Sequence, residues 1–369
     1  MRKNSNNPEI PFDDSNEESN KFTNKGKGDS EWDAILKKYC HLQITENTAI
    51  TIPVPVIKIY GETISTEGNV TTVSGPSKSG KTAFVCVVIA GAIAKGVHDS
   101  FPGVEISPAN DKAIIHIDTE QARHKHQHNL RCILKRAGLE KSPDHFVSFN
   151  IRKEPLDKYP IITRDIIQAA YKRFNGIHLI ILDGGADYVH DVNDPNESNA
   201  MVKFFEELAI DYNAPVIVII HLNPGSEKER GHLGSQLQRK SESVLTVKMQ
   251  GDISSLEPKF LRMAGKGNIP LIQFQFDKVK GYHVYCGIKP AEEQSLKEEK
   301  RITEIQKIAT EIFLPTSVFG YDHALDAIMK FTKKSEPTAK AIFKEMKAHG
   351  MIIKDENKKW KNANHFQSV

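Results

Sequence analysis

A run of eight residues has the types and spacing needed to bind a triphosphate. The residues are Gly75, Pro76, Ser77, Lys78, Ser79, Gly80, Lys81 and Thr82, in the pattern GxxxxGK[ST]. The glycines let backbone N–H groups wrap closely around phosphates. In this pattern Lys81 reaches the β- and γ-phosphates, and the hydroxyl of Thr82 is a ligand of Mg²⁺. The sequence therefore predicts that the chain binds ATP and Mg²⁺.

The segments around this loop support the same interpretation. Residues 69–73 are rich in β-branched side chains, which favours a strand, and the apolar run 82–95 is typical of a buried helix. A helix N-terminus after the loop adds a favourable dipole for phosphate. A chance glycine loop in a surface turn is the alternative, and the succession of strand, loop and helix disfavours it.

Two polar residues end predicted apolar strands further along the chain. Asp183 ends the strand at 177–183, where a carboxylate is costly unless it is paired or bound to a metal. We predict that Asp183 holds the Mg²⁺ shell, the alternative being a strand-end cap. His221 ends the strand at 214–220 and would sense the γ-phosphate through a hydrogen bond, unless it is an ordinary strand-end histidine.

Glu120 follows another apolar strand, at residues 112–118. We expect this strand to neighbour the strand that enters the phosphate loop, so that its carboxyl end faces the γ-phosphate. A carboxylate at that point can orient and deprotonate the attacking water. The alternative is that Glu120 lies in the first turn of a helix at 120–137 and stabilises its dipole, with Asp118 or Thr119 as the cap.

Three histidines on that predicted helix, His124, His126 and His128, invite comparison with a metal site. His124 and His128 share one face, but no third ligand occurs at a diagnostic spacing. We interpret these histidines as part of a solvated or subunit-facing helix surface.

Basic residues follow His221. Lys228 and Arg230 lie in the polar loop 222–230, where they would contact DNA. Other cations lie where a neighbouring subunit of a ring can supply charge to the transferring phosphate. The candidates for this role are Arg239, Lys240 and Lys266. A solvated basic face is the alternative for each of these residues.

The order of the predicted elements indicates an α/β fold. Nearly continuous apolar strands alternate with helices from residue 70 to residue 220, which is typical of a mostly parallel sheet covered on both faces. After Ser241 the pattern changes to antiparallel strands that complete the sheet. We predict these strands at 243–249, 259–263, 271–276 and 282–285.

A second unit follows a polar linker at 289–300. Three amphipathic helices and a hairpin, over residues 301–362, have the order of a winged-helix domain. Lys340, Lys344 and Lys347 lie on one face of the third helix, and we predict that this face binds single- or double-stranded DNA. The alternative is a protein-docking domain with a merely soluble basic face.

Composition limits the remaining possibilities. The chain has 369 residues and a formal net charge of only +3, so any affinity for nucleic acid must come from local basic surfaces. Its four scattered cysteines form no CxxC pair, so a zinc ribbon is disfavoured. Scattered cysteines of this kind fit a reducing, cytoplasmic location. We find no apolar run of membrane-spanning length and no signal peptide. Residues 1–30 and 363–369 are predicted tails, and 31–288 the main domain.

Four stretches of the chain carry a family resemblance. They are GPSKSGKT from Gly75, IHIDTEQARH from Ile115, IILDGGADYV from Ile180, and the segment 218–245. Together they resemble RecA-like hexameric P-loop ATPases of the plasmid RepA helicase type, and more closely AAA-type ATPases of bacterial mobilisable elements. The resemblance implies a RecA-like core, hydrolysis of Mg-ATP between subunits, and assembly as a homo-oligomer, in particular a hexameric ring, on DNA.

The same resemblance assigns roles to individual residues. Lys81 and Thr82 match the phosphate and Mg²⁺ contacts, Glu120 the catalytic glutamate, Asp183 the Mg²⁺-binding acid and His221 the sensor. The expected function is an oligomeric ATPase, helicase-like, in replication or mobilisation of a mobile element. An ATP-dependent DNA-binding regulator without translocation is the alternative. A small-molecule kinase is disfavoured, since no arginine-rich lid is evident between residues 101 and 183.

Overall fold

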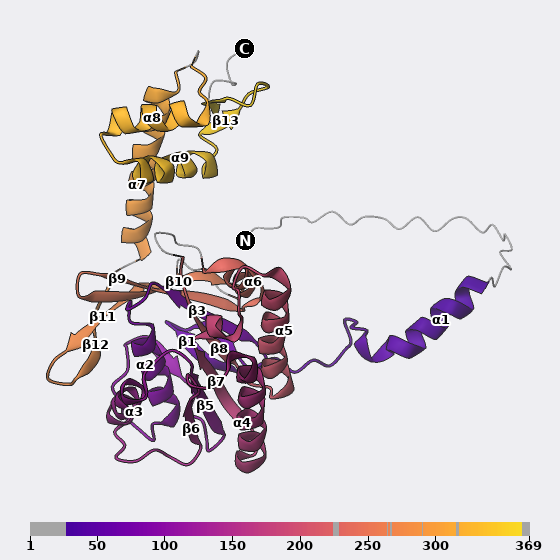
Figure 1. Cartoon of the computed structure of the whole chain (residues 1–369). Coiled ribbons are helices and arrows are strands. Elements are labelled where there is room, and N and C mark those ends of the chain that lie inside the picture. Colours follow the sequence, from indigo (N-terminus) through magenta and orange to yellow (C-terminus); the bar gives the residue numbers. More distant parts are fainter. Residues whose placement is uncertain are drawn as a thin grey trace, which may run out of the picture. The chain divides into compact units, whose positions relative to one another are not determined.

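The computed structural model describes residues 27–223, 229–263, 265, 268–289, 291–314 and 317–363 (Figure 1). The predicted tails lie largely outside these ranges, as do Lys228 and Lys266. The described residues up to Ile52 form one unit, and those from Pro53 on form another. In the first unit, α1 (Lys27–Tyr39) is a helix with exposed Trp32 and Ile35.

A nine-stranded sheet dominates the described part of the second unit, in the order β12-β11-β10-β9-β3-β8-β7-β5-β6. The strands from β9 to β6 in this order are parallel, and β10 to β12 continue the sheet antiparallel. This confirms the predicted α/β class and its RecA-like P-loop core. The strands are β3 (Val70–Gly75), β5 (Ala113–Asp118), β6 (Phe146–Asn150), β7 (Ile177–Asp183), β8 (Val216–His221), β9 (Ser243–Gln250), β10 (Ile253–Leu261), β11 (Leu271–Asp277) and β12 (Tyr282–Lys289).

Helices cover both faces of the parallel strands (Figure 1). One face packs against α2 (Lys81–Ile93) and α3 (Arg123–Ala137). The other packs against α4 (Tyr159–Phe174), α5 (Pro195–Asp211) and α6 (Gly231–Lys240). Because both faces are covered, all residues of β3, β5 and β7 are buried, which explains the nearly continuous apolar sequences of β5 and β7.

A small sheet of order β2-β1-β4 lies on the α2 side of the core. It consists of β1 (Pro55–Ile59), β2 (Glu62–Thr66) and β4 (Val104–Ile106). The turn between β1 and β2 places Tyr60 and Gly61 at positive φ, as a two-residue hairpin requires. β1 and β2 therefore form a hairpin.

The sheet order corrects one prediction. The strand before Glu120, β5, does not neighbour the phosphate-loop strand β3, because β8 and β7 lie between them. Parallel strands nevertheless end at the same edge of the sheet, so Gly75, Asp118, Asp183 and His221 all lie at the carboxyl edge.

The C-terminal elements follow the predicted order of three helices and a hairpin. They are α7 (Ala291–Ile312), α8 (Tyr321–Thr332), α9 (Glu336–Ala348), β13 (Ile352–Lys354) and β14 (Trp360–Asn362). The segment predicted as a linker is helical from Ala291 on. A separate apolar core, which includes Phe313, Ile328 and Ile342, holds these elements together.

Candidate active site

The phosphate loop joins β3 to α2. Gly80 precedes the helix with φ +99°, a left-handed conformation that favours glycine. A Cβ atom on Gly75 would collide with the carbonyl oxygen of Val247, so this position also requires glycine. The buried ammonium of Lys81 donates to the carbonyl oxygens of Gly75 (2.9 Å) and Pro76 (2.8 Å) and to Nδ1 of His221 (3.1 Å).

Several features of the loop fit a triphosphate. The first N–H groups of α2 have no partner within the helix, and they point toward its N-terminal end. Among the described residues, the buried hydroxyl of Ser79 has no hydrogen-bond partner. The loop borders a cavity of about 450 Å³, which is large enough for a nucleotide. Lys81 is held nearby with all three of its protons engaged, and it can exchange a carbonyl for a phosphate oxygen.

Asp183 and Thr82 place a carboxylate and a hydroxyl oxygen on the wall of this cavity. The Thr82 hydroxyl lies 3.5 Å from Oδ2 of Asp183. Burial, together with the charges of Asp118 and Glu120, raises the pKa of Asp183 to about 7, against the attraction of Lys81. A divalent cation would relieve this accumulation of negative charge, so the oxygen donor set fits Mg²⁺.

Glu120 contacts the phosphate loop through His221. The Nε2 atom of His221 lies 3.1 Å from Oε1 of Glu120 and 3.2 Å from Oε2. The ammonium of Lys81 has only protons to donate, so Nδ1 of His221 must be the acceptor. Nε2 then carries the proton and donates it to Glu120. The structure thus brings together Lys81, His221 and Glu120, three of the residues selected from the sequence.

Gly184 makes this approach possible across the end of β7. Its φ is +112°, and a Cβ atom there would lie 2.9 Å from Cγ of Glu120 and would collide with the hydroxyl of Thr119. The hydroxyl of Thr119 instead donates to the carboxylate of Asp187 (2.9 Å). The glycine after Asp183 therefore leaves room for the turn that carries Glu120.

The residues next to Glu120 show where the predicted helix begins. The helix predicted from Glu120 begins only at Arg123, because Oδ1 of Asp118 accepts the N–H groups of Glu120 (2.9 Å) and Gln121 (2.8 Å). The side-chain amide of Gln121 reaches the hydroxyl of Thr82 (3.3 Å). The only sequence signal was an acid placed two residues before Glu120, at the end of a strand.

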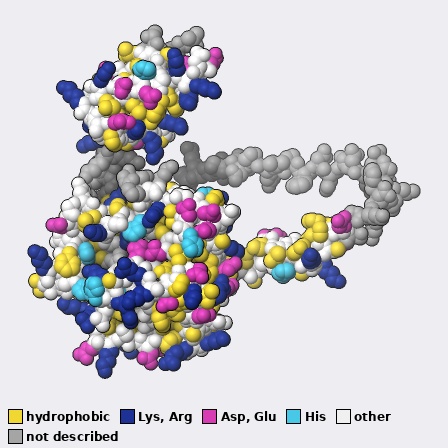
Figure 2. Space-filling model, in the orientation of Figure 1, with side chains coloured by type: hydrophobic (Ala, Val, Ile, Leu, Met, Phe, Trp, Pro, Cys, Tyr) yellow, Lys and Arg dark blue, Asp and Glu magenta, His cyan; other side chains and the backbone are white. Residues whose placement is uncertain are grey.

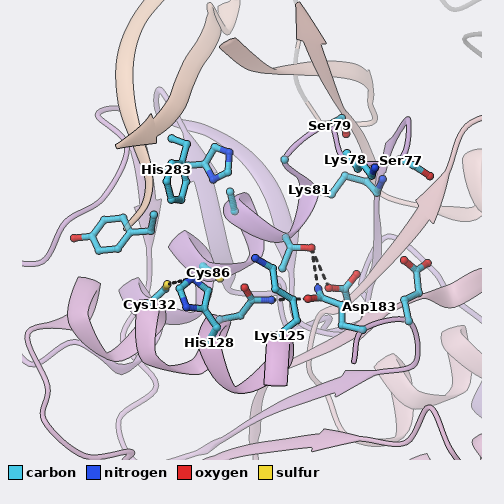
Figure 3. A pocket seen from close by; sticks show the side chains of 18 of the residues that line it. Ser77, Lys78, Ser79, Lys81, Cys86, Lys125, His128, Cys132, Asp183 and His283 are labelled. Atoms are coloured by element: carbon cyan, nitrogen blue, oxygen red, sulfur yellow. Dashed lines mark hydrogen bonds between the residues drawn. The ribbon is translucent and has the colours of Figure 1, made fainter. Parts of the chain in front are cut away.

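The end of the cavity away from the phosphate loop is lined by helix α3 and the β11–β12 hairpin. Lys125, His128 and Cys132 of α3 lie along it, with His283 opposite (Figure 3). Phe276 and Tyr282 add aromatic surface. Phosphates at the loop and a base stacked at this aromatic end would fill the cavity.

The other candidate cations lie elsewhere. Arg239 and Lys240 end α6, next to Ser241, whose hydroxyl bonds Thr72 of β3 (2.7 Å). They therefore lie toward the amino end of β3, away from the phosphate loop of the same chain. Lys240 pairs with Glu206 (3.3 Å). Lys266 and Lys228 lie outside the described residues.

The histidines of α3 separate into two kinds. His124 and His128 are exposed, as predicted for a surface, whereas His126 is buried, which corrects the prediction for that residue. Among the residues that the structure describes, no group of three or more His, Cys, Asp or Glu side chains is arranged to hold a metal ion.

Fold and site together define a P-loop ATPase. A family model described as an AAA domain matches residues 40–227, and the chain belongs to this family. No curated protein matches the chain. None of the described helices combines the length and apolar character needed to span a membrane.

The raised pKa of Asp183 predicts an unusual dependence of stability on pH. As pH rises from about 4 to 7, the unfolded chain releases this proton while the folded chain keeps it, so the carboxyl lowers the free energy of unfolding. We expect Asp183→Asn to stabilise the protein without Mg²⁺ at pH 8, on the order of 3 kcal/mol, and the gain to shrink toward pH 4. Denaturant unfolding in EDTA measures it, with exposed Asp144→Asn as control. A gain independent of pH would contradict this prediction.

Proposed function

We propose that the chain is a Mg²⁺-dependent ATPase that acts on DNA as a homo-oligomer, with a hexameric ring as the expected form. Its helicase-like action would serve replication or mobilisation of a mobile genetic element. The observation that carries the hydrolytic part is the hydrogen-bonded series Lys81–His221–Glu120 beside Thr82 and Asp183. Four free cysteines suit a reducing cytoplasm.

The chemistry follows from the positions of these side chains. Glu120 is the general base that accepts a proton from the attacking water. Lys81 stabilises the charge on the transferring phosphate. His221 contacts both Lys81 and Glu120, so a γ-phosphate bound beside Lys81 changes the position of Glu120 through this histidine. Thr82 and Asp183 hold Mg²⁺, which neutralises phosphate charge when bound.

Substitutions at the loop and at the base separate binding from hydrolysis. We expect Lys81→Ala to abolish hydrolysis, because the Lys81 ammonium is the cation held between the carbonyl oxygens of the phosphate loop and His221. Glu120→Gln should still bind ATP but turn it over roughly 10²-fold more slowly, since the amide cannot take a proton. Steady-state hydrolysis and equilibrium binding of a fluorescent ATP analogue measure the two effects. Wild-type turnover by Glu120→Gln would remove Glu120 from this role.

Assembly is proposed because the basic end of α6 lies away from the phosphate loop of its own chain. Arg239 is exposed, and its guanidinium bonds only a neighbouring glutamine on the same helix among the contacts described (Gln236, 3.3 Å). From this position the guanidinium can reach a nucleotide phosphate only on another subunit. The proposal therefore assigns Arg239 and Lys240, with Lys266, to the neighbouring nucleotide site.

A mixing experiment tests this arrangement. The double variant Arg239→Ala/Lys240→Ala and the variant Glu120→Gln should each be nearly inactive alone. Mixed oligomers contain some sites with both a good base and good cations, so part of the hydrolysis should return. The ATPase rate against mixing ratio, with oligomer mass as the control for assembly, gives the answer. Intact mixed oligomers without recovery would indicate a site complete within one chain.

Contact with DNA near the nucleotide site is proposed for the loop after β8. Both stems of this loop are tied to the site: the N–H of Leu222 bonds Gly75 O (3.2 Å), and the N–H of Arg230 bonds His221 O (3.0 Å). Arg230 is exposed at the start of α6. A phosphate bound by Arg230 or Lys228 would therefore pull on the sensor directly.

The C-terminal helices and hairpin are proposed to form a winged-helix domain that binds DNA. Lys340, Lys344 and Lys347 are exposed along α9, as the predicted face requires. Lys340 is paired with Glu336 (2.7 Å), and Lys347 lies over the ring of Trp360. The visible face of this unit carries both basic and acidic side chains (Figure 2), so we expect moderate affinity.

The salt dependence of DNA binding tests this face. Changing Lys340, Lys344 and Lys347 to alanine should weaken binding to a duplex and lower the log–log salt slope by about 2 to 3, since each phosphate contact contributes roughly 0.9. The control changes Lys307 and Lys330, on α7 and α8, to alanine. Fluorescence anisotropy from about 50 to 200 mM salt measures both slopes. Equal slopes for the wild type and the α9 variant would assign this unit to protein contacts.

A DNA-binding regulator is the second candidate function. The order of three helices and a hairpin favours it, because this architecture binds duplexes without requiring movement along them. Hydrolysis stimulated by single-stranded DNA, together with strand separation, would indicate a motor. Nucleotide-dependent duplex binding without strand separation would indicate the regulator.

A further inference from the structure

A series of hydrogen bonds, centred on the buried side chains of Asp118 and His126, supports the turn that carries Glu120 from behind. Asp118, fully buried, accepts the N–H groups of Glu120 and Gln121 through Oδ1. Its other oxygen, Oδ2, accepts from Nδ1 of His126 at 2.8 Å. His126 lies on α3 and is 6% exposed. Both oxygens of this carboxylate are thus occupied, one by the turn and one by the helix.

The series continues to the edge of the sheet. Nε2 of His126 lies 3.0 Å from the hydroxyl of Ser148 on β6, and that hydroxyl lies 3.0 Å from Nδ1 of His116 on β5. The two imidazole rings are stacked, with centroids 5.2 Å apart. Burial, with a smaller contribution from His126, lowers the pKa of His116 to about 4, so His116 is neutral at pH 7.

The contacts define the direction of each hydrogen bond. Nδ1–H of His126 donates to the carboxylate of Asp118, so in the neutral ring Nε2 accepts the proton of the Ser148 hydroxyl. The Ser148 oxygen then accepts from Nδ1–H of His116. Nε2 of His116, which is buried without a partner among the described residues, carries no proton that needs one.

A buried carboxylate of this kind is costly unless donors compensate it. Burial raises the pKa of Asp118, but the hydrogen bonds from His126 and Gln121 outweigh burial and lower the pKa below its ordinary value. The ionised carboxylate therefore bonds the turn 119–122 firmly and keeps it out of helix α3. That conformation is the one in which Glu120 reaches His221.

From this geometry, and resting on the proposed role of Glu120 as general base, we propose that His126 and Asp118 are positioning residues for hydrolysis. His126 orients the carboxylate of Asp118, and that carboxylate holds the backbone of Glu120 where its side chain meets His221. Neither residue touches the nucleotide. Small displacements of a reacting group lower rates steeply, so the effect should appear in kcat and not in nucleotide affinity.

Ser148, His126 and Asp118 also have the order of a serine-hydrolase triad. Two contacts argue against that role here. The hydroxyl of Ser148 already bonds a second imidazole, that of His116, and the second oxygen of Asp118 holds the turn that carries Glu120. These hydrogen bonds therefore support the turn of Glu120 at the ATPase site and do not form a separate hydrolase site.

Two amide substitutions at one position test the proposal. In His126→Asn the side-chain N–H₂ takes the place of Nδ1 and keeps the bond to Asp118, whereas in His126→Gln it takes the place of Nε2 and loses that bond. The full-length protein is assayed for kcat and KM in ATP hydrolysis. We expect His126→Asn to keep kcat within about threefold of wild type, and His126→Gln to lose roughly 10- to 100-fold. KM and the affinity for a fluorescent ATP analogue should stay within about twofold.

Controls separate this inference from the proposed function. His124→Gln, on an exposed position of the same helix, should leave kcat unchanged, and circular dichroism with thermal melting confirms folding of each variant. Equal kcat for folded His126→Asn and His126→Gln would overturn the positioning role, even if Glu120→Gln is slow. If Glu120→Gln turns over like wild type, the assignment of the base fails instead.

If His126→Gln does not fold, Asp118→Asn replaces it. The asparagine keeps an acceptor for the turn but loses the second carboxylate oxygen, which accepts from His126. A kcat loss for Asp118→Asn with unchanged KM supports the proposal, and wild-type kcat overturns it.

Discussion

The site depends on one geometric constraint: a carboxylate that follows β5 must reach a phosphate loop that follows β3, although β7 and β8 lie between them. Neighbouring parallel strands are about 4.8 Å apart, so the gap is roughly 14 Å at the backbone. Glu120 and His221 cross it in two steps, with the histidine at the end of β8 in contact with both Lys81 and Glu120. Gly184, at the end of β7, is the point over which the turn passes.

Charge distinguishes the roles of the groups gathered at this site. Three carboxylates, Asp118, Asp183 and Glu120, are close enough to influence one another, and Lys81 lies beside them. Burial lowers the pKa of Lys81, while the attraction of Glu120 and Asp183 raises it. Two of the carboxylates differ in how their buried charge is compensated. Hydrogen-bond donors from the chain lower the pKa of Asp118, whereas the pKa of Asp183 is raised. Asp183 lies beside Thr82, where Mg²⁺ is proposed to bind.

Local patterns were sufficient to predict most of this arrangement. The P-loop, the strand ending at Asp183 and the change to antiparallel strands all follow from spacing and hydrophobic periodicity, and the sheet confirms the fold. Strand order could not be predicted, because it depends on contacts between distant segments. For the same reason His126 was interpreted as a surface residue: only the packing of α3 against β5 and β6 shows that it is buried. The start of α3 was missed because Asp118 bonds the backbone in competition with the helix.

The two supports of Glu120 suggest how hydrolysis is controlled. On one side the turn is held by Asp118, which is itself buried and accepts from the buried ring of His126. On the other side Glu120 touches His221, whose carbonyl oxygen accepts from the N–H of Arg230 at the stem of the loop that follows β8. If Glu120 is the base, as proposed, a displacement of this stem would change the contact of Glu120 with His221, while Asp118 holds the backbone of Glu120 in place. In the other stem the N–H of Leu222 bonds Gly75 O of the phosphate loop. Binding of a triphosphate to that loop would therefore change the affinity for DNA at the proposed contact, and DNA would change the affinity for the nucleotide by the same factor.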